Sequence, residues 1–327
     1  MHRHAARRRM RLADSAELCR DATSTWIAFR RHSGKVVKCA AMLAIVPTCA
    51  GAAGVLDPQG PVGSAEKLIL INSLAIMLPI VIPTILATLG FAWWFRASNA
   101  KAAYQPTFVY SGRIELIIWS IPILVILLLG GIAWISAHEL DPAQPLASQK
   151  KPLEVQAVSV DWKWLFIYPD EKIATVNQLV VPVATPIHFS LTSASVMNAF
   201  FVPQLGSMIY TMNGMTTQLN LQADKLGDYH GLSSHYSGAG FSGMNFKLHA
   251  VTDGEFAAWV DKARAGGPTL DEKAYADLVK QSKNVPPAIY RDVVPDLFNS
   301  IATQKLAPGP GPAEGNSAPS LSPKREG

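Results

Sequence analysis

The stretch Ser233-Ser-His-Tyr-Ser237-Gly-Ala-Gly-Phe241-Ser-Gly-Met244 lies between two segments with strand-like sequence. Its glycines and serines are typical of a loop. Residues 216–221 before it and residues 244–250 after it alternate apolar and polar side chains with a period of two. That pattern indicates strands with one buried face and one wet face. The stretch therefore predicts an irregular loop that belongs to a β domain.

The spacing of this loop resembles the copper loop of subunit II of the haem-copper oxidases. In the cytochrome c oxidases of that family, Cys-x-x-x-Cys-x-x-x-His-x-x-Met holds a binuclear copper centre. On this chain the cysteine positions are Ser233 and Ser237, the histidine position is Phe241, the methionine position is Met244, and Asn198 stands at an outlying histidine position. Such copper needs soft thiolates and imidazoles, and these side chains do not supply them. The resemblance is therefore to the bacterial bo-type ubiquinol oxidases, whose subunit II keeps the fold without the metal.

Composition favours a membrane protein with a folded domain outside the bilayer. The chain has 327 residues, of which 49% are apolar and only 16% charged, a low charge content for a wholly soluble protein. The net charge of +5 comes partly from the basic residues 1–38, which lack the interleaved aromatics of a nucleic-acid site and favour membrane targeting. All three cysteines, Cys19, Cys39 and Cys49, precede residue 50. A disulfide framework or a cysteine metal site in the folded part is therefore excluded.

Residues 1–49 read as a targeting region. Basic residues precede a short apolar run, 39–47, too short to span a bilayer. Val46-Pro-Thr-Cys49 resembles a lipoprotein cleavage box, which makes Cys49 the candidate lipidation site; ordinary cleavage after Ala50 or Ala53 is the alternative. The length of the basic start also suggests that translation begins near Val36 or Val37, from a non-ATG codon. Residues 50–66 are expected to form a periplasmic N-terminal segment.

Residues 67–138 predict a hairpin of two transmembrane helices. The run 68–95 carries no charged residue, and a second apolar run covers 114–135; each is long enough to cross about 30 Å of hydrocarbon. The loop between the runs, 96–113, carries basic residues and no acid. By the positive-inside bias this loop is cytoplasmic, and everything after His138 lies in the periplasm.

Glu115 is the acid at the cytoplasmic edge of the second span. From its position alone, the simpler interpretation is that it reaches water and pairs with Arg113. In the haem-copper oxidases, however, a Glu-x-x-x-Trp motif followed by proline places this acid at the mouth of a proton pathway into subunit I. Glu115, Trp119 and Pro122 are similar to that motif. The resemblance therefore makes Glu115 a proton-pathway candidate.

Residues 139–251 predict a β domain, and the resemblance implies a cupredoxin-like Greek-key barrel. Short strand-like segments recur between turn residues; they cover 153–160, 177–183, 186–192 and 199–202, besides the two that flank the loop. Periodicity alone leaves sandwich and barrel open. The aromatic patch 161–168 contains Trp162 and Trp164, which we expect to pack the domain and its contact with subunit I. His230 and His235 bracket a loop, but a surface role is favoured over a metal site.

Residues 252–306 predict a small helical extension, and residues 307–327 a disordered tail rich in proline, glycine and serine. Thr252-Asp-Gly-Glu255 is a capping box before an apolar helical face. Further helices are expected over 269–281 and 294–302. With Tyr275, Tyr290 and Phe298, the region resembles the aromatic-rich C-terminal extension of quinol-oxidase subunit II.

The resemblance implies a subunit without catalytic residues of its own in a proton-pumping ubiquinol oxidase of the bacterial inner membrane. No cofactor is expected in this chain, whereas haem b, haem o and copper are expected in subunit I. Expected partners are subunit I, further small membrane subunits, membrane lipid, and ubiquinol as substrate of the complex; nucleic acid is not among them. Two alternatives are a copper-containing cytochrome c oxidase subunit II and a membrane-tethered scaffold or binding lipoprotein. The missing thiol and imidazole ligands disfavour the first, and the second leaves the loop spacing and Glu115 unexplained.

Overall fold

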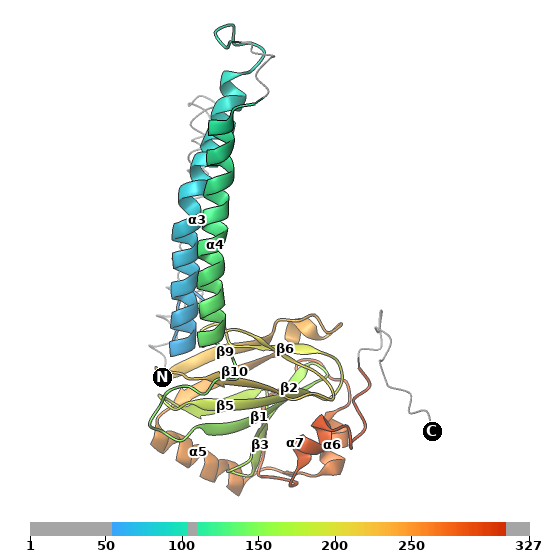
Figure 1. The fold of residues 1–327 in the computed structure, drawn as a ribbon. Helices are drawn as coiled ribbons and strands as arrows, with labels where there is room; N and C mark the ends of the chain where they lie inside the picture. Colours follow the sequence, from blue (N-terminus) through green and yellow to red (C-terminus); the bar gives the residue numbers. More distant parts are fainter. Residues whose placement is uncertain (1–53, 104–109, 312–327) are drawn as a thin grey trace, which may run out of the picture. The chain divides into compact units, whose positions relative to one another are not determined.

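The computed structural model describes residues 54–103 and 110–311. The predictions for Cys49, for the targeting region 1–49 and for the tail beyond residue 311 fall outside these ranges. The described part consists of a helical hairpin, a β domain and a C-terminal region with short helices (Figure 1).

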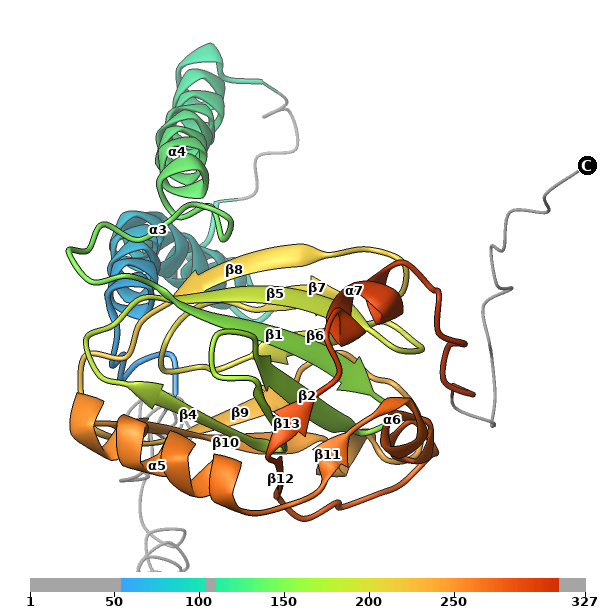
Figure 2. The same ribbon diagram turned by 90° about the horizontal axis from the view of Figure 1, so that it is seen from below.

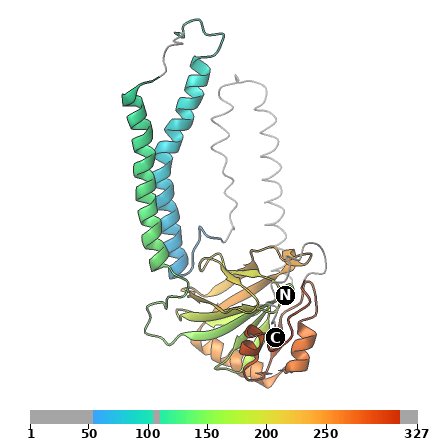
Figure 3. The same cartoon turned by 45° about the vertical axis from the view of Figure 1, so that its right-hand side comes forward.

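The hairpin consists of α3, Pro61–Trp94, and α4, Gly112–Glu139. Both helices are long and apolar enough to cross a membrane, with mean hydropathies of 2.3 and 2.7 over their most apolar windows. They run side by side (Figures 1 and 3). Helix α3 begins earlier than the uncharged run because Pro61 supplies a first-turn residue that needs no N–H partner. The predicted spans are confirmed as helices, with these wider bounds.

The first residues of α3 are hydrogen-bonded to the β domain. The N–H of Gly63 donates to the carbonyl of Leu205 at 2.9 Å, and a carboxylate oxygen of Glu66 accepts from the N–H of Ser207 at 3.0 Å. Gly60 approaches the backbone so closely that an added Cβ would lie 2.1 Å from the carbonyl oxygen of Gln222. The start of the hairpin is thus fastened to the domain by backbone contacts and by the side chain of Glu66.

The β domain is built from two main sheets. The six-stranded sheet has the order β12-β3-β2-β1-β5-β8 and the five-stranded sheet the order β4-β10-β9-β6-β7. The strands of the first are β1 Leu153–Val160, β2 Lys163–Tyr168, β3 Ile173–Val176, β5 Ile187–Ser193, β8 Thr217–Leu221 and β12 Ala288–Tyr290. Those of the second are β4 Gln178–Pro182, β6 Asn198–Phe201, β7 Ile209–Thr211, β9 Gly227–Ser233 and β10 Asn245–Val251. Pairing is antiparallel except between β1 and β5 and between β4 and β10.

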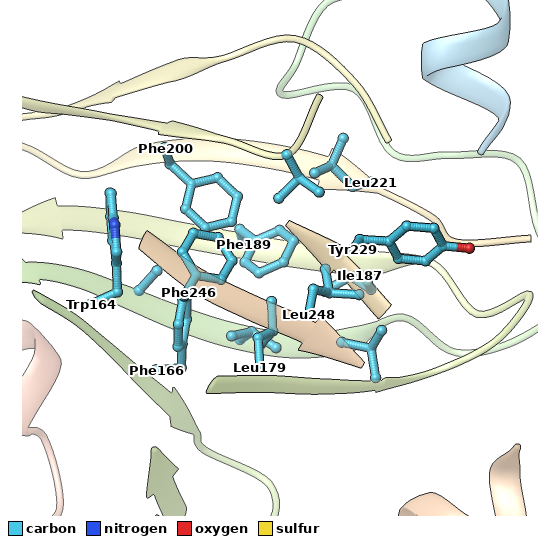
Figure 4. Packing of buried hydrophobic residues seen from close by; sticks show 14 of the residues in the cluster. Trp164, Phe166, Leu179, Ile187, Phe189, Phe200, Leu221, Tyr229, Phe246 and Leu248 are labelled. Atoms are coloured by element: carbon cyan, nitrogen blue, oxygen red, sulfur yellow. The ribbon is translucent and has the colours of Figure 1, made fainter. Parts of the chain in front are cut away.

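The two sheets enclose an aromatic core (Figure 4). The rings of Trp164 and Phe166 on β2 contact Phe200 on β6 and Phe246 on β10, with centroid separations of 5.0–6.3 Å. Phe246 lies over Gly231 on the neighbouring strand, where an added Cβ would be 2.0 Å from the ring. The glycine therefore provides the space that this ring occupies.

Most of the C-terminal region covers the outer face of the six-stranded sheet with a second core, whereas its first helix packs Val260 and Ala263 against the core between the sheets. It contains α5 Asp253–Ala265, β11 Thr269–Leu270, α6 Glu272–Leu278, β13 Asp292–Val293 and α7 Leu297–Ala302 (Figure 2). Leu165 and Ile167 of β2 pack in this core with Leu270, Tyr275 and Phe298. Strand β12 also pairs with β3. The region is therefore an integral layer of the folded domain.

These elements give the fold class that the sequence predicted: a two-helix hairpin, a β domain and a small helical extension. The capping box at Thr252 is confirmed. Helix α6 begins at Glu272 and stops at Leu278, within the expected 269–281, because residues 269–270 form strand β11 with β13. The segment boundaries at 49, 66, 138, 251 and 306 stay predictions, although β10 ends at Val251 and α5 begins at Asp253.

Candidate functional site

The loop between β9 and β10 is closed by its own backbone. The N–H of Ser233 donates to the carbonyl of Met244 at 3.0 Å, which joins the two ends of the loop. Inside it, Phe241–Gly243 forms one turn of 3-10 helix. Three residues before this turn, Gly238 has φ 105°, a backbone conformation that residues other than glycine rarely adopt.

The structure brings several of the predicted copper-ligand positions together. The hydroxyl of Ser233 donates to the amide oxygen of Asn198 at 3.2 Å, and both residues are buried. Met244 and Ser237 are buried as well. Phe241 is only half-buried, and its ring meets the edge of Tyr236 at a centroid separation of 5.6 Å.

This donor set does not fit a binuclear copper centre. Two hydroxyls and an amide are hard, neutral oxygen donors, and Met244 alone offers a soft atom. The Ser233 hydroxyl is already engaged with Asn198. In residues 54–103 and 110–311, no group of three or more histidine, cysteine or acidic side chains is placed to hold a metal ion. His235 instead sets its ring against Tyr210 at 5.8 Å, and His230 is exposed.

Both tryptophans of the aromatic patch pack the domain, as expected. Trp164 is fully buried in the core between the sheets. Trp162 is also buried, has φ 60°, and donates its indole N–H to the carbonyl of Ser237 at 3.0 Å. Trp162 therefore contacts the loop that carries the copper-ligand positions.

Sequence reasoning missed two buried polar residues that hydrogen-bond the C-terminal extension, Lys163 and Asn177. The ammonium of Lys163 donates to the carbonyl of Lys280 at 2.8 Å and to the hydroxyl of Ser282 at 2.6 Å. Burial lowers the pKa of Lys163, and the neighbouring Asp161 opposes that shift. A lysine within an otherwise apolar aromatic strand was the signal that could have identified the first of the two.

Glu115 lies in the first turn of α4 and is exposed. Residues 115, 119 and 122 recur at helical spacing, so Glu115, Trp119 and Pro122 share one face of α4. The simpler interpretation paired Glu115 with Arg113, but residues two apart do not face each other on a helix. None of the ion pairs within the described residues involves either side chain.

Comparison with known proteins gives two family matches. The model for the periplasmic domain of cytochrome c oxidase subunit II matches residues 170–251, and that for the COX aromatic-rich motif matches residues 264–309. A solved periplasmic domain of cytochrome oxidase subunit II from Bradyrhizobium japonicum is 27% identical, with a TM-score of 0.35, over 37% of this chain and 98% of that one.

Curated relatives cover much more of the chain. The cytochrome bo(3) ubiquinol oxidase subunit 2 of Pseudomonas aeruginosa is 50% identical over 76% of this chain and 75% of its own length. The ubiquinol oxidase subunit 2 of Acetobacter aceti is 51% identical over 76% of this chain and 82% of its own length. With this identity over most of both chains, the protein belongs to the ubiquinol oxidase subunit II family.

Proposed function

We propose that this chain is the copper-free, non-catalytic second subunit of a proton-pumping ubiquinol oxidase that reduces oxygen to water. The observation that carries the proposal is the hydrogen bond between Ser233 and Asn198 in place of metal ligands. Without a copper relay, a soluble cytochrome has no entry point for electrons on this chain. A donor dissolved in the lipid, ubiquinol, is consistent with such a loop and with the curated relatives' names.

The redox groups of this complex are assigned to its partner. Haem b, haem o and copper would be held by subunit I, and this chain would cover that subunit on the periplasmic side and support assembly. Two candidate membrane helices and a periplasmic-domain family match support a two-pass location in the bacterial inner membrane. Further small subunits and lipid would complete the complex.

The test is purification of the complex through a tag on this chain, followed by three measurements. We expect a haem spectrum, oxygen uptake driven by ubiquinol, and no copper beyond that of subunit I. Copper bound in the periplasmic domain, with electrons accepted from a soluble cytochrome, would favour the cytochrome c oxidase alternative. Purification without any haem-bearing subunit would favour the scaffold lipoprotein.

Glu115 is proposed to stand at the entrance of a proton pathway into subunit I. Its exposure in the first turn of α4, on the same face as Trp119, supports a contact with a neighbouring membrane subunit. We expect Glu115→Gln to slow oxygen turnover while assembly and haem content stay normal. Glu139→Gln, at the other end of the same helix, is the matched control. Equal turnover in the two variants would remove Glu115 from the pathway.

Cys49 is proposed as the site of lipid attachment, on the basis of Val46-Pro-Thr-Cys49. Mass spectrometry of the N-terminal peptide of the mature chain tests this directly. An acylated peptide that begins at Cys49 is the expected result. An unmodified peptide that begins after Ala50 or Ala53 would replace lipidation with ordinary signal cleavage.

A further inference from the structure

On the proposed function, no metal centre cross-links the loop 234–244, and the loop is ordered by hydrogen bonds instead. Besides the bond that closes its base, the N–H of Phe241 donates to Gly238 at 3.1 Å, and that of Met244 donates to Phe241 at 3.0 Å. Local bonds of this kind do not by themselves hold a glycine-rich loop against the rest of a domain. Contacts from outside the loop are therefore needed.

The indole ring of Trp162 is the first such contact. Its N–H bonds the carbonyl of Ser237, and Gly240 lies so close that an added Cβ would be 2.3 Å from the ring. The ammonium of Lys283, in the C-terminal extension, lies 5.5 Å from the ring centroid. Trp162 thus joins the loop to the extension.

A second contact comes from Asn284, also in the extension. The side-chain oxygen of Asn284 approaches Gly243 so closely that a Cβ there would be 2.2 Å away. Asn284 has φ 53°, a conformation that asparagine tolerates better than most residues. Residues 283 and 284 therefore meet the loop at two glycines, one directly and one through Trp162.

The segment 280–285 is itself fixed to the β domain by buried side chains. Lys163 bonds the carbonyl of Lys280 and the hydroxyl of Ser282. Asn177 donates its amide to the carbonyl of Val285 at 2.8 Å and accepts the N–H of Trp164 at 2.8 Å. Bonds from a buried ammonium are among the stronger ones in proteins. The segment is therefore held at both ends, with the loop contacts between them.

We propose that residues 280–285 of the aromatic-rich extension brace the loop 234–244 and do the structural work of the missing metal. This assigns the extension a task beyond covering the sheet. The inference rests on the metal-free loop of the proposed function. It predicts that order in the loop depends on the extension and not on any bound ion.

Amide hydrogen exchange of the purified complex, followed on peptides that cover 234–244, tests the brace. Lys283→Ala removes the cation over Trp162 from an exposed position, so folding is retained, and loop exchange should rise about two- to fivefold. Lys163→Met removes two bonds of a buried ammonium, and exchange should rise by about tenfold or more. Lys273→Ala, an exposed lysine of α6 in the same extension, is the control and should leave the loop unchanged.

The coupling should also run in the opposite direction, because linkage between two sites is reciprocal. Gly243→Ala drives a methyl group against Asn284, so peptides that cover 280–285 should exchange faster. Loop exchange that stays at the wild-type rate in both lysine variants would overturn the brace. If a copper chelator accelerates loop exchange in the wild type, a metal holds the loop, and the copper-free function fails as well. An unchanged rate with chelator, together with the lysine effects, supports both.

Discussion

Tyr168, on β2 of the six-stranded sheet, hydrogen-bonds the edge strand β4 of the five-stranded sheet. We predict that Tyr168→Phe loosens β4. The buried hydroxyl donates to the carbonyl of Val180 and accepts from the N–H of the same residue, each at 2.9 Å. Strand β4 is the outer strand of the five-stranded sheet, so one side of it lacks a strand partner. The tyrosine supplies that missing partner from β2.

Phenylalanine keeps the ring but leaves two buried backbone groups of Val180 unpaired. Each such group costs about 1–3 kcal/mol, so opening of β4 should become about 2–6 kcal/mol easier. Amide exchange in residues 178–182 of the intact complex should then accelerate about 30-fold or more. Tyr229→Phe is the control, since its hydroxyl only donates to the carbonyl of the exposed Lys225. If both variants exchange alike over 178–182, Tyr168 does not hold this edge.

The same residue gives the domain a pH dependence at the alkaline end. Burial raises the pKa of Tyr168 above its usual value, and the hydrogen bond to Val180 opposes this only in part. Because the folded-state pKa is the higher one, the stabilising contribution is complete below the unfolded-state pKa of about 10 and is lost as pH rises above it. Stability of the wild type should therefore fall more steeply than that of Tyr168→Phe above about pH 10.

Three further predictions concern packing and capping. Gly231→Ala forces a methyl group into the Phe246 ring and should destabilise the domain by about 1–3 kcal/mol, measured by denaturant titration of the complex against wild type. Gly60→Ala meets a backbone carbonyl just after β8, so the yield of assembled complex should fall; an unchanged yield would mean that the start of α3 is not fastened there. Thr252→Ala removes the cap of α5 at a cost of about 1 kcal/mol. Hydrogen bonds from the backbone N–H and the hydroxyl of Thr252 lower the pKa of Glu255. The part of the cap that depends on the Glu255 carboxylate is therefore present above the unfolded-state pKa and is lost as pH falls through the folded-state pKa. Equal amide exchange in the first turn of α5 in variant and wild type would contradict the capping role.

Strands and helices could be predicted from the sequence where one face of the element is exposed to water. Residues 245–250 alternate in the structure as in the sequence, with Phe246, Leu248 and Ala250 buried. The capping box ahead of α5 rests on local bonds between neighbouring residues, and local geometry is what a sequence motif encodes. The two helices of the hairpin could be predicted from their long apolar runs alone, because their side chains are exposed along most of their length and their composition does not depend on contacts within the chain.

Two strands that are buried on both faces, β2 and β3, were not predicted as strands. Every residue of β2 and of β3 is buried, because the aromatic core covers one face of the sheet and the extension covers the other. Such strands show no period of two. Strand β9 was missed for a different reason, since its sequence contains Asp228, His230 and two glycines.

In the candidate site too, some residues could be predicted from the sequence and others could not. Homologous spacing was enough to place Ser233, Ser237, Phe241 and Met244 along the loop between β9 and β10 and to single out Asn198 on β6. It gave no hint of the hydrogen bond between Asn198 and Ser233. The roles of Lys163 and Asn177 depend on partners more than 100 residues away along the chain. Contacts at that separation are set by the tertiary fold, and no periodicity reports them.

The pairing of β12 with β3 has a consequence for biogenesis. Residues 288–290 complete the six-stranded sheet at its β3 margin, so that margin stays open until nearly the whole polypeptide has been exported. A partly exported chain presents an unsatisfied row of amide groups to any neighbouring extended segment. Premature termination shortly before Ala288 should therefore yield a product that is prone to aggregation or proteolysis rather than a smaller functional subunit.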